Sequence, residues 1–408
     1  MTLLTTDELN RARKVAHRVS ASPVEPDDFA SLDDVVARAL WSGLGEPGDR
    51  VVGMICDALG PMAALDALAE RPTSRELARL VAPSAPDDDD DALAEMLDEA
   101  LQRWLPRLQA SDAVGHLERA HRIGASLLVP SNPLWPEGLS RLGAHSPGAL
   151  WVRGNVGVLE TLDKSVSIVG ARASTGYGEH VTMDVVTSLV DRGFSIVSGA
   201  AYGIDGMAHR AALSSEGNTI AVLAGGIDRL YPSGHDALLR RIIESGLVVT
   251  ELPCGFAPTK WRFLQRNRLI AAMSCATVVV EAGWRSGSLN TAHHALDMDI
   301  PVGAVPGPVT SASSAGTHRL LRETPAICVT NASEVAELIT GHADALVVPD
   351  LDHPHATRVL DALSRTRARN LDEIVALSGL TPLQLMSVIG LLELQGAVRQ
   401  NATGWLRA

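Results

Sequence analysis

Hydrophobic and polar positions follow different patterns in different parts of the chain. Up to about residue 110, apolar and charged positions alternate at helical spacing, which predicts a helical domain over 1–110. In the centre, short β-branched apolar runs recur at intervals of roughly 25–30 residues, and each is followed by glycine and an amphipathic stretch. That pattern is typical of parallel strands joined by crossover helices.

The central runs predict an α/β fold: an extended Rossmann-like, doubly wound, mostly parallel sheet over 111–345, with a Pro- and Gly-rich connector at about 111–160. Sheets of this kind bind ligands outside the carboxyl ends of their strands. Strands are expected at Val166–Val169, Ser195–Val197, Thr219–Leu223, Leu247–Glu251, Thr277–Glu281, Val302–Val305 and Ile327–Val329.

The C-terminal residues 354–408, after a linker over 346–353, predict three helices and a hairpin. The helices are expected at Ala356–Ser364, Leu371–Ser378 and Pro382–Gln395, and the whole resembles a winged helix. The third helix contains no basic residue, which disfavours readout of the DNA major groove. A protein contact or an autoregulatory role is the favoured interpretation of this domain.

Composition narrows the class of protein. The chain has 408 residues and a net charge of -13, and no run of about 18 apolar residues interrupts it, so we expect a cytoplasmic protein without a membrane span. Its four cysteines lie far apart without a C-x-x-C motif, which argues against a disulfide framework or a zinc site. The acidic run Asp87–Asp91 directly precedes a helical pattern and is interpreted as a favourable helix N-terminus.

One window departs from the acidic character of the chain. From Leu252 to Val280 there is no acidic residue, while basic and aromatic residues alternate within it. We interpret it as a basic-aromatic loop that binds a polyanion with flat faces, as single-stranded nucleic acid is. The alternative is a solvated charged helix face. The residues concerned are Lys260, Trp261, Arg262, Phe263, Arg266, Asn267 and Arg268.

Small-residue loops follow the predicted strands, and their glycines allow backbone amides to approach a phosphate. Because the strand ends of a parallel sheet share one edge, we expect Arg172, Lys260, Arg266 and Arg268 to form one surface with these loops. The loop residues predicted to bind are Gly170, Arg172, Ser198, Gly199, Gly203, Ser286 and Gly287.

No catalytic, cofactor or metal site is predicted. The glycine spacing is not G-x-G-x-x-G, and the P-loop, G-x-S-x-G and H-E-x-x-H motifs are absent. His293 and His294 lack a partner cysteine or acidic cluster for a metal. Asp205 is placed to cap the helix that follows it. His209 lies one helical turn later, at i+4, and is expected to make a structural hydrogen bond with Asp205.

Several segments between about residues 121 and 340 form a recognisable set of motifs in consistent order. They are Val169–Arg172, Ser198–Asp205 with Ala208-His209, Ala221–Asp228 with Tyr231-Pro232, Phe263–Ala271, Glu281–Leu289 and Ala304–Gly307. Together they resemble the DNA-processing protein A (DprA/Smf) family. The resemblance implies a protein that binds single-stranded DNA, forms a homodimer and helps load the RecA recombinase in natural transformation or related recombination. It assigns strand contact to Arg172, Lys260, Phe263, Arg266 and Arg268. Tyr202 departs from the family pattern, which usually has a basic residue there.

The competing class is an enzyme. The loop that begins at Glu281 has a likeness to the Gly-rich, hydroxyl-bearing active-site loop of phosphoribohydrolases, which act on nucleoside monophosphates on a related fold. The basic-aromatic window is too large for a mononucleotide pocket, and this favours the binding protein.

Overall fold

The computed structural model describes residues 3–81, 90–110, 112–340, 354–365, 367–394, 396–401 and 404–407. The chain divides into two compact units, Met1–Gly341 and His342–Ala408, and each is described by itself. The expected linker over 346–353 lies outside the described residues.

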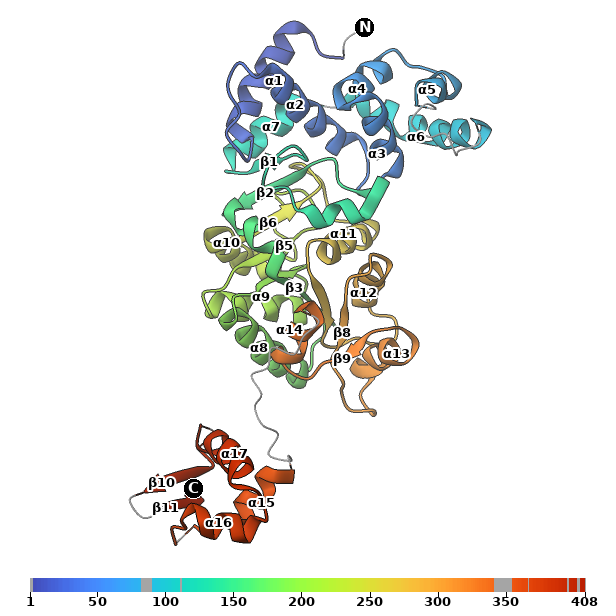
Figure 1. Cartoon of the computed structure of the whole chain (residues 1–408). Coiled ribbons are helices and arrows are strands. Elements are labelled where there is room, and N and C mark those ends of the chain that lie inside the picture. Colours follow the sequence, from blue (N-terminus) through green and yellow to red (C-terminus); the bar gives the residue numbers. More distant parts are fainter. Residues whose placement is uncertain are drawn as a thin grey trace. The chain divides into compact units, whose positions relative to one another are not determined.

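A nine-stranded sheet forms the centre of the first unit in the part of the chain that the structure describes (Figure 1). Its order is β1-β2-β6-β5-β4-β3-β7-β8-β9, in which β1 and β2 are antiparallel and all other neighbours from β6 to β9 are parallel. The strands are β1 (Ser126–Leu128), β2 (Leu150–Gly154), β3 (Ser165–Val169), β4 (Ser195–Ser198), β5 (Thr219–Val222), β6 (Leu247–Thr250), β7 (Ala276–Val279), β8 (Val302–Ala304) and β9 (Ile327–Cys328).

The expected doubly wound α/β fold is confirmed, and β3 to β9 coincide with the predicted strands to within two residues at either end. The connector contributes the antiparallel strands β1 and β2 at one edge of this sheet. From β3 the chain adds β4, β5 and β6 on one side and then crosses over to add β7, β8 and β9 on the other. The order therefore reverses between β3 and β7, where such sheets form their ligand crevice.

Helices cover both faces of the sheet because successive strand residues point to opposite faces. In β7, Val278 belongs to the same hydrophobic cluster as helices α8, α9 and α14, whereas Val279 belongs to the cluster of α11 and α12. The helices that follow the strands are α8 (Gly176–Asp191), α9 (Ile204–Ser214), α10 (Asp236–Ser245), α11 (Lys260–Ala272), α12 (Ser288–Asp297), α13 (Ala315–Glu323) and α14 (Ala332–Thr340).

The N-terminal helices pack directly against the β1–β2 edge of the sheet (Figure 1). One hydrophobic cluster joins Val35 of α2 to Trp151 of β2 and Leu239 of α10. The expected domain boundary near residue 110 therefore stays a prediction, because residues on both sides of it belong to one compact unit. These helices are α1 (Thr6–Val19), α2 (Phe29–Leu44), α3 (Arg50–Leu59), α4 (Pro61–Ala69), α5 (Ser74–Val81), α6 (Asp90–Ala110) and α7 (Ala113–Arg122).

The acidic run falls at the start of α6. The helix begins at Asp90, within the acidic run, while Asp87–Asp89 lie outside the described residues, so the capping interpretation stays a prediction.

The second unit has the predicted winged-helix order. It contains α15 (Pro354–Ala362), α16 (Leu371–Ser378), α17 (Pro382–Leu394) and the antiparallel hairpin of β10 (Val398–Asn401) and β11 (Gly404–Arg407). Leu383 and Met386 of α17 are exposed, and no basic residue lies on this helix.

Among the described helices, no single helix is both long and apolar enough to span a membrane. Two sharply bent helix pairs, Arg50–Leu59 with Pro61–Ala69 and Leu371–Ser378 with Pro382–Gly390, meet the length and composition criteria only when each pair is taken together.

His209 makes the expected structural hydrogen bond, but with a different partner. Its Nδ1 lies 2.8 Å from Thr219 Oγ1, and the Thr219 hydroxyl itself donates to the Ile196 carbonyl. Nδ1 therefore carries the proton, and Nε2 has no partner among the described residues. The predicted pairing with Asp205 is wrong, because that carboxylate binds backbone amides instead. Burial lowers the pKa of His209 to about 3, since a second proton would add an unpaired charge to the core.

This buried imidazole is expected to destabilise the fold in acid. Its folded-state pKa of about 3 lies below the ordinary unfolded value, so between these pH values only the unfolded chain takes up the proton. Lowering the pH from 7 to 5 should therefore cost about 2 kcal/mol through this group. Over the same pH interval, the free energy of unfolding of His209→Asn should fall by about 2 kcal/mol less than that of the wild type, whatever its stability at pH 7. Urea unfolding curves at pH 7 and pH 5 measure this difference.

His180→Asn is the control, because His180 is exposed. If the free energy of unfolding depended on pH equally in both variants, the assignment of this effect to His209 would be wrong.

Candidate nucleic-acid interface

A pocket of about 780 Å³ lies at the carboxyl ends of the parallel strands. Its walls come from the segments that follow β3, β4, β5, β6 and β7, so the expected convergence of the loops on one edge is confirmed. The pocket includes the point between β3 and β7 where the strand order reverses. Eight predicted residues line it: Gly170, Arg172, Lys260, Phe263, Arg266, Asn267, Ser286 and Gly287.

The basic-aromatic segment is the first part of helix α11, so its prediction as a loop is wrong. Thr259 caps this helix, because its side-chain oxygen accepts the Arg262 N–H at 3.3 Å. Helical spacing then separates the basic residues by face. Lys260, Phe263 and Asn267, at i, i+3 and i+7, line the pocket, whereas Arg262 and Arg268 do not.

Arg266 lies in the floor of the pocket and is only 5% exposed. Its Nη1 donates to the Gly199 carbonyl at 2.6 Å and also to the carbonyl of Val222, which joins the ends of β4 and β5 to α11. Burial lowers its pKa to about 10, with Asp205 opposing the shift, so the group remains charged at neutral pH. The contact also explains Gly199, since a Cβ there would approach Nη1 to 2.5 Å.

Asp205 is a site residue that the sequence interpretation missed. Its buried carboxylate accepts the amides of Gly170 at 3.3 Å and Gly199 at 3.2 Å, and so ties the loops after β3 and β4 together. The expected helix cap is not made, because the N-cap of α9 is Gly203 and has no side-chain bond. Burial raises the pKa of Asp205, and Arg266 with the bound amides opposes that rise. The sequence signal that could have identified Asp205 is its position in the first turn of helix α9, directly after the Gly-rich end of β4.

Three exposed cations surround the pocket: Arg172, Lys260 and Arg285. None of them makes an ion pair within the described ranges, so all three are available to an anion. The Arg172 guanidinium lies over the Phe263 ring, 5.1 Å from its centroid. Tyr231 packs against the same ring at 5.6 Å and is itself 47% exposed. Arg285 was not predicted, because a lone basic residue in a loop has no distinguishing pattern.

Arg268 does not share this surface, which corrects the expectation of four cations on one face. Its side chain is 3% exposed and pairs with Glu251 at 2.5 Å, outside the pocket. Ser198, Gly199 and Gly203 also do not line the pocket. Ser198 donates to the Ile168 carbonyl, and Gly203, at φ 75°, leaves no room for a Cβ beside the Ala171 carbonyl. These residues hold the loops in place.

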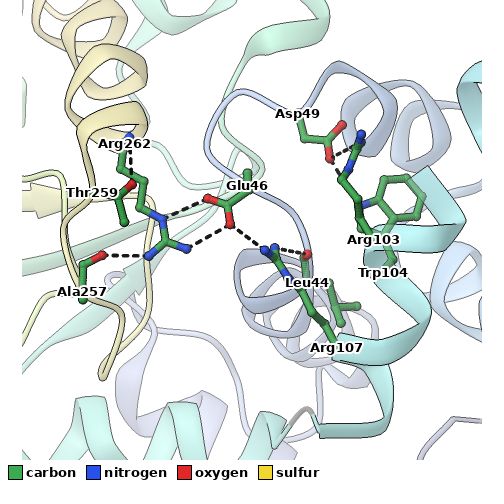
Figure 2. A network of polar contacts seen from close by, with 9 residues as sticks. All are labelled: Leu44, Glu46, Asp49, Arg103, Trp104, Arg107, Ala257, Thr259 and Arg262. Atoms are coloured by element: carbon green, nitrogen blue, oxygen red, sulfur yellow. Dashed lines mark hydrogen bonds and ion pairs between the residues drawn. The ribbon is translucent and has the colours of Figure 1, made fainter. Parts of the chain in front are cut away.

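Arg262 forms an ion pair with Glu46 of the N-terminal helical region (Figure 2). Glu46, just after α2, accepts its Nε at 2.9 Å and its Nη2 at 3.0 Å, and accepts Arg107 of α6 at 2.7 Å. Arg262 Nη1 also donates to the Ala257 carbonyl at 2.8 Å. Burial raises the pKa of Glu46, but its bonds to the two arginines outweigh this and leave the pKa below its usual value. The start of α11 is thereby fixed to the helical region.

Glu281, the residue behind the phosphoribohydrolase alternative, is 2% exposed and does not line the pocket. Its carboxylate accepts the Thr175 amide at 2.9 Å and hydroxyl at 2.6 Å, and the Ser313 hydroxyl at 3.2 Å. It therefore anchors the start of α8. No group of three or more His, Cys, Asp or Glu side chains suited to a metal occurs among the described residues.

The fold and pocket define a Rossmann-like protein with a cationic, aromatic-lined crevice at its strand ends and a winged-helix unit. Residues 126–340 match the family model described as DNA recombination-mediator protein A, and residues 346–404 match the DprA winged helix domain. The chain belongs to the DNA recombination-mediator protein A family, as the motif resemblance implied.

Named relatives agree with this assignment. The chain is 42% identical over 366 residues to a putative DNA processing protein DprA of Mycobacterium tuberculosis. This alignment covers 84% of this chain and 92% of the relative. It is 41% identical over 192 residues to protein Smf of Escherichia coli, covering 47% of this chain and 50% of that protein. The X-ray structure of DprA from Streptococcus pneumoniae aligns with a TM-score of 0.58 at 27% identity, covering 76% of this chain and 99% of the other.

Proposed function

We propose that this chain binds single-stranded DNA without base preference in the strand-end pocket. The observation that carries the proposal is the presence around one pocket of three exposed cations, Arg172, Lys260 and Arg285, that form no ion pair with any described residue, in a chain whose net charge is -13. A phosphate backbone supplies the matching charge, and backbone amides of the Gly-rich loops supply further donors.

The aromatic side chains of the pocket favour a single strand over a duplex. Phe263 and Tyr231 line the pocket, and Tyr231 is 47% exposed. Stacking on such rings requires an unpaired base, and it tolerates any sequence because every base has a flat face. A duplex exposes its phosphates but not its base faces.

Membership of a recombination-mediator family supports a role for the bound strand in recombination. We infer that the protein protects exposed or incoming strands and helps load a RecA recombinase, acting as a homodimer, as the resemblance implies. In this role it is a binding protein and not an enzyme.

The enzyme alternative lacks a free acid. Both Glu281 oxygens accept hydrogen bonds, and Asp205, the one acid among the described residues that line the pocket, binds two backbone amides. The purified protein should therefore release no free base from a panel of nucleoside monophosphates. Release at a rate proportional to protein concentration would favour the phosphoribohydrolase.

A salt titration tests the binding proposal. Fluorescence anisotropy with an oligothymidylate should give a logarithm of the binding constant that falls linearly with the logarithm of salt concentration, by about 0.7 for each phosphate neutralised. Three exposed cations predict a slope near -2 or steeper. An affinity that does not depend on salt would contradict binding through phosphates.

A further inference from the structure

A second pocket, of about 590 Å³, adjoins the first on the side of β2 and α10. Tyr231 and Pro258 line both pockets and form a shared rim. Three further arginines line the second pocket: Arg153 of β2, Arg229 in the segment after β5, and Arg240 of α10. None of them lies in the segments that resemble the DNA-processing protein A family.

The second pocket carries three arginines against two aspartates, Asp228 and Asp236, which leaves one net positive charge. Arg229 lies 3.6 Å from Asp228 and Arg240 lies 2.7 Å from Asp236, but their side chains remain 55% and 62% exposed. Arg153 is half-buried, and its side chain makes no hydrogen bond or ion pair with any residue that the structure describes. Guanidinium groups suit phosphate oxygens, which they can bind through paired N–H groups.

The first pocket is too small for a long strand. Its volume of about 780 Å³ is that of a site for one drug-sized ligand, whereas single-strand sites extend over roughly 4–16 nucleotides. A longer strand must therefore leave the pocket over part of its rim. Tyr231 offers an exposed ring at the rim shared with the second pocket, on which a base can stack.

We propose that a bound single strand crosses the rim at Tyr231 and Pro258 and continues into the second pocket, where Arg153, Arg229 and Arg240 bind its phosphates. The inference rests on the proposed function and adds the path of the strand to it. An acidic peptide would meet the same charges, but the rim shared with the first pocket favours the strand.

The test compares oligothymidylates of about 5 and about 15 nucleotides, chosen to fill one pocket or both. The variant Arg153→Ala/Arg240→Ala should bind the long oligonucleotide about tenfold more weakly, with a salt slope shallower by about 1.4 for two lost contacts. Its affinity for the short one should be unchanged. Arg241→Ala is the matched control, because Arg241 is the exposed neighbour of Arg240 but lines neither pocket. Arg153→Lys/Arg240→Lys should keep the wild-type slope.

Three outcomes would overturn this path. The double alanine variant could bind the long oligonucleotide as tightly as Arg241→Ala does, or it could lose equal affinity for both lengths. It could also bind DNA normally while losing a labelled polyglutamate that the wild type binds, which would make the second pocket a peptide site. Failure of the wild type to bind either oligonucleotide would instead contradict the proposed function itself.

Discussion

Glu251→Ala is expected to destabilise the unit Met1–Gly341 by about 3–5 kcal/mol, because it leaves the Arg268 guanidinium buried without a counterion. Arg268 is 3% exposed, and its Nε and Nη1 already lack partners among the described residues. Burial raises the pKa of Glu251, while Arg268 and the Gly48 amide oppose the rise. Denaturant unfolding at pH 7 measures the loss.

Glu118→Ala provides the matched comparison. The Arg11–Glu118 pair has nearly the same length, 2.6 Å against 2.5 Å, but its side chains are 66% and 39% exposed. Water screens such a pair, so its loss should cost at most about 1 kcal/mol. Similar losses in the two variants would show that burial of the Glu251–Arg268 pair is not what makes it important.

Arg172→Ala/Lys260→Ala is expected to weaken single-strand binding by about tenfold to a hundredfold, or about 1.4–2.7 kcal/mol. Both cations are exposed and line the pocket from different elements, Arg172 after β3 and Lys260 at the start of α11. Removing two phosphate contacts should make the salt slope shallower by about 1.4. Anisotropy titrations at several salt concentrations measure both quantities.

Phe263→Ala separates stacking from charge in the same assay. It should cost about 1–3 kcal/mol of binding free energy while the salt slope stays unchanged, because a ring neutralises no phosphate. Phe263→Leu keeps apolar volume without the aromatic face and should bind almost as weakly as the alanine variant.

The double variant Arg172→Ala/Lys260→Ala has its own contradicting outcome. A salt slope equal to that of the wild type would contradict the assignment of Arg172 and Lys260 to phosphate contacts.

The strands β3 to β8 could be predicted from sequence because each is a local pattern, a short apolar run that is followed within a few residues by glycine. The positions of the arginines could not, since they depend on distant partners. Arg262 pairs with Glu46, 216 residues away, and Arg268 with Glu251, 17 residues away, so a run that reads as one basic surface is divided among three environments. Asp205 was missed for a similar reason, because its amide partners belong to two different loops.

Helical spacing within Lys260–Arg268 held more information than a count of its charges. Once the segment is a helix, positions i, i+3 and i+7 must share a face, and these residues line the pocket. An interpretation of the acid-free window from composition alone assigns all of its basic residues to one surface, and this is why Arg268 was placed on the wrong surface.

Competition between single-stranded and blunt duplex DNA of the same sequence tests the central claim most directly. With labelled single strand bound to the wild-type protein, unlabelled single strand should displace it at a concentration at least about tenfold lower than duplex, and the preference should persist as salt is raised because stacking is not screened. Equal or better displacement by the duplex would contradict the assignment of the strand-end pocket to single-stranded DNA.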